Sequence, residues 1–176
     1  MHRPTSVAVM TRFAIAFACV LISGGAAAQP PAPHARTALD AERDAILAVV
    51  QSFFDTMATK DSTTARQILL PDGRFYAVGD QTSKVRIRAF TVEEYLFDLP
   101  AMKQNLRERM WDPEVRIRGF IANVWTPYDF WTNGRLSHCG VDSFDLIKTD
   151  KGWRIAGLTY TIESKCQPSP LGPLKK

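Results

Sequence analysis

The second half of the chain reads as a series of β-strands separated by tight turns, and this pattern constrains the fold more than any other feature. Residues 106–111 precede an Asp112-Pro113 turn, and three longer strand patterns follow at residues 114–131, 135–148 and 153–163. The dipeptide Asn133-Gly134 favours a two-residue type I′ turn, which joins antiparallel neighbours. The sequence therefore predicts an antiparallel sheet built from consecutive strands.

The first half combines helices with shorter strands. Residues 37–60 repeat apolar side chains at the spacing of an amphipathic helix. Asp61 caps a second, short helix that Pro71 ends, and Thr91 opens a capping box for a third helix that runs to Leu99. Two strands, at residues 75–78 and 84–90, lie between the second and third helices. This order predicts an α+β fold in which helices cover one face of a curved sheet.

The first 28 residues have the composition of a signal peptide. An apolar run at residues 13–22 follows two arginines and precedes the small residues of 23–28. We expect cleavage after Ala28 and a periplasmic or secreted protein, with lipidation at Cys19 as the weaker alternative. The rest of the chain would then comprise a Pro-rich leader at residues 29–38, one domain at residues 39–166 and an irregular tail at residues 167–176.

The charge and the motifs argue against several classes of partner. The formal net charge is +4, and loss of Arg3 and Arg12 with the signal peptide lowers it to +2 (4 − 2 = 2). So small a charge gives no reason to expect nucleic acid, a membrane surface or stable membrane insertion after cleavage. We also expect no cofactor, because no glycine-rich nucleotide loop or nucleophile elbow occurs, and no metal, because no ligand cluster has metal spacing.

Three segments resemble a known family. FFDTMATKD at residues 53–61, LLPDG at residues 69–73 and GVDSFDLIKTDKGWRI at residues 140–155 are similar to the nuclear transport factor 2-like superfamily, in particular to its bacterial members. That superfamily includes SnoaL-like polyketide cyclases, ketosteroid isomerase and scytalone dehydratase. The resemblance implies a cone-shaped, curved antiparallel sheet covered on one face by three helices, and a homodimer formed through the outer sheet face. It leaves the function open, because this fold hosts both enzymes and plain binders.

The two hairpin turns predict which strand residues share a face. With Asn133-Gly134 as one turn, Asp129 faces His138 and Trp125 faces Asp142; with Asp150-Lys151 as the next, Asp142 faces Thr159. The face predicted to line a pocket carries Asn123, Trp125, Asp129, His138, Asp142, Phe144 and Thr159.

Asp142 is the first candidate for acid or base chemistry, because it lies among apolar neighbours where a carboxylate needs a partner or a role. The alternative for Asp142 is a purely structural hydrogen bond to Thr159 or to the backbone. Asp129 could orient His138 as a general-base dyad, and the alternative for these two residues is an exposed cross-strand pair.

The opposite face of the same strands is too apolar to be left in water. It carries Ala122, Val124, Tyr128, Phe130, Cys139, Val141, Leu158, Tyr160 and Ile162. We expect a dimer interface there, or cover by the tail or a loop, and a β-bulge in these strands would exchange the faces locally. We expect a disulfide between Cys139 and Cys166, provided that the chain turns back after Glu163.

Two kinds of function fit these observations. The first is a binder of a small, mainly apolar molecule, held by Asn123, Trp125 and Asp142. The second is a small cofactor-independent isomerase, dehydratase or cyclase that uses Asp142 or the Asp129–His138 pair as acid and base.

Overall fold

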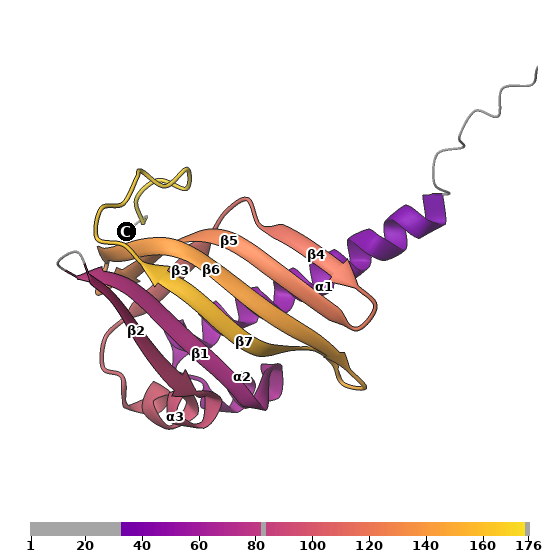
Figure 1. The fold of residues 1–176 in the computed structure, drawn as a ribbon, viewed down its shortest axis with the longest axis horizontal. Helices are drawn as coiled ribbons and strands as arrows, with labels where there is room; N and C mark the ends of the chain where they lie inside the picture. The colour runs from indigo at the N-terminus through magenta and orange to yellow at the C-terminus, as the bar shows by residue number, and fades with distance from the viewer. Residues whose placement is uncertain (1–32, 82–83, 175–176) are drawn as a thin grey trace, which may run out of the picture. The chain divides into compact units, whose positions relative to one another are not determined.

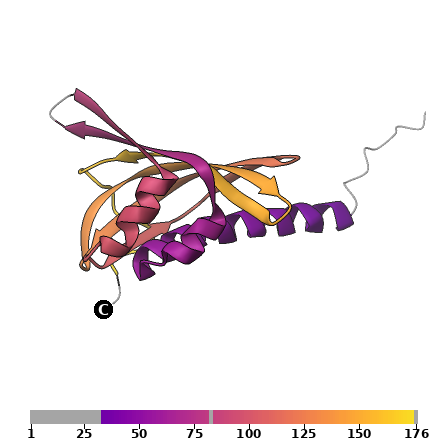
Figure 2. The ribbon, with the colours of Figure 1, turned by 90° about the horizontal axis from the view of Figure 1, so that it is seen from below.

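The fold is a curved sheet of seven strands with its helices on one face (Figures 1 and 2). The computed structural model describes residues 33–81 and 84–174. The elements are α1 Pro33–Thr59, α2 Ser62–Ile68, β1 Leu69–Gln81, β2 Lys84–Thr91, α3 Val92–Asp98, the 3₁₀ turn η1 Leu99–Ala101, β3 Leu106–Met110, β4 Glu114–Arg118, β5 Ile121–Thr132, β6 Arg135–Thr149 and β7 Gly152–Ile162. The strand order is β2-β1-β7-β6-β5-β3, with β4 also paired to β5, and only β1 and β7 run parallel. The predicted α+β class and the curved sheet are confirmed.

The predicted helix starts are confirmed at their caps. The side chain of Asp61 accepts hydrogen bonds from the backbone N–H groups of Thr63 and Thr64, and this fixes the start of α2. Thr91 and Glu94 form the reciprocal capping box that starts α3. Both short helices are therefore started by local hydrogen bonds that the sequence alone specifies.

The two predicted hairpin turns are present, but one predicted strand is wrong. Asn133 and Gly134 both have positive φ, as a type I′ turn requires, and Thr132 pairs with Arg135. Thr149 likewise pairs with Gly152 across the second turn. The single strand expected at residues 114–131 is instead two strands, β4 and β5, because the chain reverses at Gly119, whose φ is +57°.

Two β-bulges shift the strand register by one residue each. Phe130 pairs with His138 while Trp131 pairs with Leu136, so Ser137 is the extra residue in β6. Asp145 pairs with Gly157 while Leu146 pairs with Ile155, so Ala156 is the extra residue in β7. Beyond each bulge the predicted partners are wrong by one position, and a one-residue shift moves a side chain to the other face.

The face covered by helices, here called the inner face, holds the hydrophobic core. Phe53 and Phe54 of α1 both pack edge-on against Phe144 of β6, at ring-centroid distances of 5.8 and 5.9 Å. Val124 and Ile155 from the neighbouring strands are fully buried in the same cluster. The packing of the aromatic stripe of α1 therefore determines which face of the sheet is inner.

This arrangement corrects the predicted dimer face. The residues expected to face outward include Ala122, Val124, Tyr128, Phe130, Leu158, Tyr160 and Ile162, and all of them lie in the core or line the inner-face cavity described below. The helices, and not a second copy of the chain, cover this apolar surface. The opposite surface, here called the outer face, carries Trp125, Ile121 and Ile147, which are 49%, 60% and 40% exposed.

The C-terminal tail turns back onto the outer face. Cys139 of β6 pairs with Glu163 through two backbone hydrogen bonds. The chain then reverses, and Cys166 is bonded to Cys139. The predicted signal peptide and residues 29–32 of the predicted Pro-rich leader lie outside the described residues, whereas residues 33–38 of that leader belong to α1. Among the residues that the structure describes, no helix is both long and apolar enough to cross a membrane.

Candidate functional site

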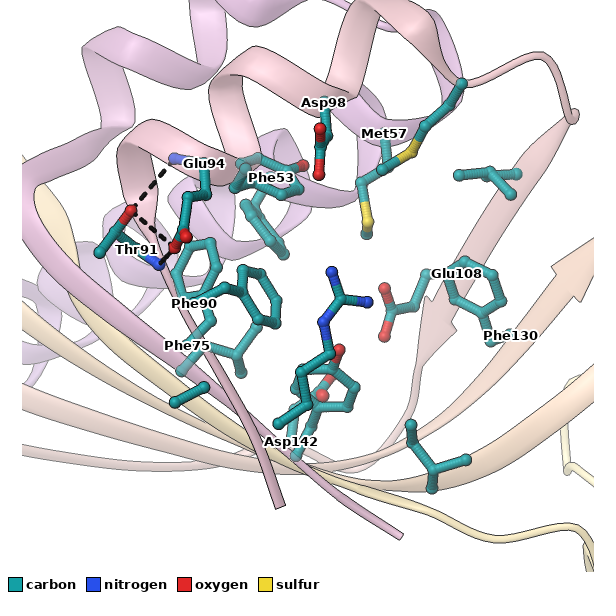
Figure 3. Close-up of a pocket in the computed structure, with 18 of the residues that line it drawn as sticks. Phe53, Met57, Phe75, Phe90, Thr91, Glu94, Asp98, Glu108, Phe130 and Asp142 are labelled. Carbon is teal, nitrogen blue, oxygen red and sulfur yellow. Dashed lines mark hydrogen bonds between the residues drawn. The ribbon is translucent and has the colours of Figure 1, made fainter. Parts of the chain in front are cut away.

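A cavity of about 890 Å³ opens between the inner face of the sheet and the helices (Figure 3). Its walls come from α1, β1, β2 and α3 on one side and from β3, β5, β6 and β7 on the other. The aromatic lining residues are Phe53, Phe75, Phe90, Tyr95, Phe97, Tyr128, Phe130, His138 and Tyr160. The size lies within the range of about 300–1,000 Å³ that small-molecule pockets occupy.

The aromatic walls form because residues from distant segments pack edge to face. Phe75 of β1 contacts the rings of Phe53, Phe90 and Tyr95 at centroid distances of 5.4 to 5.8 Å. On the facing wall, the His138 ring stacks on Phe130 at 4.7 Å with an interplanar angle of 21°. Both walls therefore present flat, apolar surfaces to the cavity.

His138 is a neutral member of this wall. Its Nδ1 lies 3.1 Å from the hydroxyl oxygen of Ser137, the bulged residue. Burial lowers the pKa of His138 below its ordinary value, because the charged imidazolium would lose water contacts. Near pH 7 the ring is therefore an uncharged surface with hydrogen-bonding nitrogens.

The polar centre of the cavity is a pair of carboxyl groups, Glu108 from β3 and Asp142 from β6 (Figure 3). Asp142 is 1% exposed and Glu108 is 9% exposed. The two carboxyl groups lie close enough that each affects the pKa of the other. Oδ2 of Asp142 is buried and has no hydrogen-bond partner among the described residues.

Burial changes the acidity of both groups. Desolvation raises the pKa of Asp142 to about 8, although the hydrogen bond from Glu108 partly opposes the change. Desolvation also raises the pKa of Glu108 well above its ordinary value, and the nearby charge of Asp142 adds to the effect. The pair thus retains at least one proton at neutral pH, because two adjacent buried carboxylates repel each other.

The mouth of the cavity is more polar. Arg88 of β2 lies there with its guanidinium 5.3 Å from the centroid of the Phe90 ring. Three acids of α3, Glu93, Glu94 and Asp98, also line the opening. Phe97 is 82% exposed beside them, so an apolar side chain interrupts the charged rim.

The predicted Asp129–His138 dyad is wrong, because the two side chains lie on opposite faces of the sheet. The bulge at Ser137 places His138 opposite Phe130 and turns Asp129 to the outer face. There Asp129 accepts two hydrogen bonds from Arg109, at 2.9 and 2.5 Å, and is 2% exposed. Arg109 also donates to the carbonyl oxygen of Gly172 in the tail, so this ion pair anchors the C-terminus.

Four further predicted pocket residues lie outside the cavity. Asn123 and Trp125 lie on the outer face, where Asn123 donates hydrogen bonds to Ser143 and Asp145. Thr159 is exposed on the same face, because the bulge at Ala156 pairs Asp142 with Tyr160 instead. Phe144 is on the inner face but is fully buried under α1. The predicted set therefore places only Asp142 and His138 in the cavity.

The sequence reasoning missed Glu108, although a signal for it was present. In β3, Leu106, Glu108 and Met110 alternate with Arg107 and Arg109. Glu108 therefore occupies an apolar-face position of a half-buried strand, where an acid needs a partner. Which acid it meets depends on the curvature of the sheet, because β5 separates β3 from β6 in the strand order.

Solved structures with the same architecture identify the fold. An NTF2-like protein with a cystatin-like fold from Novosphingobium aromaticivorans superposes with a TM-score of 0.61 at 13% identity, covering 76% of this chain and 89% of that one. An NTF2-like superfamily protein from Salmonella enterica serovar Typhimurium superposes with a TM-score of 0.58 at 14% identity, covering 75% and 98% of the two chains. A protein of unknown function from Mycobacterium tuberculosis gives a TM-score of 0.59 at 18% identity, covering 81% and 80%. The fold is that of the nuclear transport factor 2-like superfamily.

A family model narrows the assignment. Residues 41–161 match the family described as "Putative lumazine-binding", and the chain belongs to that family. No curated protein sequence matches the chain significantly.

Proposed function

We propose that this domain binds a small, flat, mainly apolar molecule in the inner-face cavity. The observation that carries the proposal is the cavity itself, about 890 Å³ in volume and lined by nine aromatic rings, together with aliphatic side chains, around one carboxyl pair. An apolar enclosure with a few converging polar groups is the usual form of a small-molecule site. The function expected from the sequence is retained, with a different set of lining residues.

The family description suggests the first ligand to test. Lumazine is a fused bicyclic ring whose edge carries N–H and C=O groups. Such a ring could lie against the stacked Phe130 and His138 wall while its polar edge meets Glu108 and Asp142. The stacking wall would supply affinity, and the carboxyl pair would orient the ligand.

The experiment compares two aromatic residues of the same strand. We expect lumazine, or a related bicyclic heterocycle, to bind the purified domain in titration calorimetry and to raise its melting temperature. Phe130→Ala should weaken binding about tenfold or more, because it removes an aromatic ring from the Phe130–His138 wall of the cavity. Trp125→Ala is the matched control, since Trp125 lies on the outer face and is 49% exposed. Equal affinity in both variants, or no binding by any flat bicyclic probe, would contradict the proposal.

A second function is favoured by the acidity of Asp142. A carboxyl group whose pKa is raised to about 8 can accept and return a proton near neutral pH. The domain could therefore act as a cofactor-independent isomerase, dehydratase or cyclase with Asp142 as the acid and base. Isomerisation of a β,γ-unsaturated ketone, followed by its ultraviolet absorbance, tests this function. Activity that survives in Asp142→Asn would exclude the assigned role.

We further propose that the domain is exported and forms a homodimer through its outer face. The Cys139–Cys166 disulfide supports an oxidising compartment, and the exposed Ile121 and Trp125 support an interface. A phosphatase fused after residue 28 should be active outside the cytoplasm. Sedimentation of the domain should show a dimer that Trp125→Arg dissociates, and a wild-type monomer at micromolar concentration would contradict the interface.

A further inference from the structure

The carboxyl pair in the cavity lacks the counter-charge that buried acids normally have. Among the described residues, no lysine, arginine or histidine forms an ion pair with Glu108 or Asp142. Oδ2 of Asp142 is buried and has no hydrogen-bond partner among the described residues. Buried carboxyl groups are usually paired, because removing a charge from water costs several kcal/mol. The unmet requirement lies inside an open cavity and not in the packed core.

We propose that the ligand of this cavity carries a cationic nitrogen, which binds against the Glu108–Asp142 pair while its apolar body fills the aromatic slot. The inference rests on the proposed binding function and specifies its ligand class. A protonated amine or amidine would donate charge-assisted hydrogen bonds to the carboxyl oxygens, including Oδ2 of Asp142. The aromatic faces around the pair add a favourable cation–π term.

The charges around the cavity favour this class. The titratable groups that face the pair inside the cavity are Arg88 of β2, Tyr95 of α3, Tyr128 of β5, His138 of β6 and Tyr160 of β7. At the mouth, α3 adds Glu93, Glu94 and Asp98, whereas α1 lines the cavity only with the uncharged Phe53 and Met57. Asp129 lies on the outer face, and its charge acts on Glu108 through the sheet. Five acids therefore line the cavity against one arginine, and of the five only Glu93 has an ion-pair partner among the described residues, Arg66. His138 is neutral near pH 7 because burial lowers its pKa. The resulting potential attracts cations and repels carboxylates.

Arg88 is the internal cation that could compete with a ligand. Its side chain is exposed at the mouth, where the guanidinium lies over Phe90 instead of binding an acid. Removing this charge with Arg88→Gln should strengthen the binding of a cationic probe. A purely steric or apolar pocket would show no such gain, so Arg88 provides a sensitive test.

Cation binding should also displace a proton. The pair retains a proton at pH 7 because burial raises both pKa values. A cation placed against the pair stabilises the ionised form, so binding should release up to about one proton per ligand. Affinity for the cation should therefore increase as the pH is raised from about 6 to about 8.

The experiment uses three probes with one apolar body and different charges: naphthylethylammonium, naphthylethanol and naphthylacetate. We expect the ammonium to bind at least tenfold more tightly than the alcohol, and the carboxylate to bind least. Calorimetry of the ammonium in buffers of different ionisation enthalpy measures the protons released. Lumazine is titrated into the same protein sample, so that its affinity can be compared with those of the three probes.

Variants at the pair localise the effect. Asp142→Asn and Glu108→Gln keep the shape of the site and should each remove the preference for the ammonium over the alcohol. Asp145→Asn is the matched control, because Asp145 lies on the same strand but is exposed on the outer face. Circular dichroism and the melting temperature confirm that each variant is folded.

The outcomes separate this inference from the broader proposal. If lumazine or naphthylethanol binds as tightly as the ammonium and no proton is released, the pocket is real and the cationic ligand class is wrong. If none of the probes binds, the proposed binding function itself fails. A preference for the ammonium that persists in Asp142→Asn and Glu108→Gln would place the cation elsewhere and overturn the inference.

Discussion

Two neighbouring residues of β3, Glu108 and Arg109, show that buried acids have different partners on the two faces of the sheet. Arg109 points outward and binds both carboxylate oxygens of Asp129, which in turn is almost fully buried. Glu108 points inward toward Asp142, another acid, and neither forms an ion pair with a cation in the described structure. The first pair satisfies its charges internally and ties down the C-terminal tail. The second leaves a polar requirement open toward the cavity that we propose as the binding site.

The largest expected effect on stability comes from breaking the Arg109–Asp129 ion pair, here called the outer pair. Asp129→Ala should reduce the free energy of unfolding by about 3 kcal/mol, because it leaves the mostly buried Arg109 without its partner. Urea denaturation measures the change. Asp145→Ala is the control: Asp145 is an exposed acid on the same face, and its replacement should change the free energy of unfolding by no more than about 0.5 kcal/mol. A similar loss in both variants would mean that the Arg109–Asp129 pair has no special structural role.

The disulfide should contribute nearly as much to the same face. Cys166→Ser frees the tail from β6 and should lower the free energy of unfolding by about 2–3 kcal/mol, because the bond closes a loop between residues 27 positions apart. Denaturation of wild type and variant in oxidising buffer gives the difference. Adding a reductant to the wild type should reproduce the loss, and an unchanged wild type under reduction would contradict it.

The Glu108–Asp142 pair on the inner face should instead make stability depend on pH. The pKa of Asp142 is raised from an ordinary value of 3.8 to about 8, so the folded state holds more protons than the unfolded state between these values. The free energy of unfolding should therefore fall as the pH rises through this window, by roughly 1 kcal/mol per pH unit. Denaturation at about pH 5 and about pH 7.5 measures the slope. Asp142→Asn should reduce the slope but not abolish it, because the buried Glu108 still titrates with a raised pKa, whereas a slope that is equal in variant and wild type would place the titrating group elsewhere.

The smallest effect concerns the geometry of the outer pair. Arg109→Lys keeps the charge but loses the two parallel hydrogen bonds to Asp129 and the contact of the guanidinium with the Trp131 ring. We expect a loss of about 1 kcal/mol in the free energy of unfolding. Thermal denaturation of wild type, Arg109→Lys and Asp129→Ala ranks the three proteins. A lysine variant as stable as the wild type would show that charge alone suffices.

The local features of the fold were predictable because short-range chemistry determines them. Asp61 and Thr91 cap their helices through bonds to residues two or three positions away. Asn133 and Gly134 adopt positive φ whatever lies beyond the hairpin. The apolar stripe of α1 likewise follows from residue spacing alone. These signals were sufficient for the α+β class and for the succession of elements along the chain, apart from the reversal at Gly119, but not for the parallel pairing of β1 with β7.

The site was less predictable because two single-residue bulges decide which side chains face inward. Neither Ser137 nor Ala156 differs in type from ordinary strand residues, yet each reverses the faces beyond it. The predicted dyad of Asp129 and His138 failed for this reason alone. Asp142 faces inward as predicted, because it lies on the same side of β6 as the core residues Phe144 and Leu146.

By itself, the sequence determined the helix caps, the hairpin turns, the cysteine pair and the amphipathic helix, since each depends on neighbours within a few positions or on composition. Only the tertiary structure decided that Glu108 would meet Asp142 and that Arg109 would meet Asp129. Those pairings depend on sheet curvature, bulges and the packing of α1, which are properties of strands brought together from across the chain. Local chemistry thus specifies the elements, and their assembly brings two acids together in the inner-face cavity.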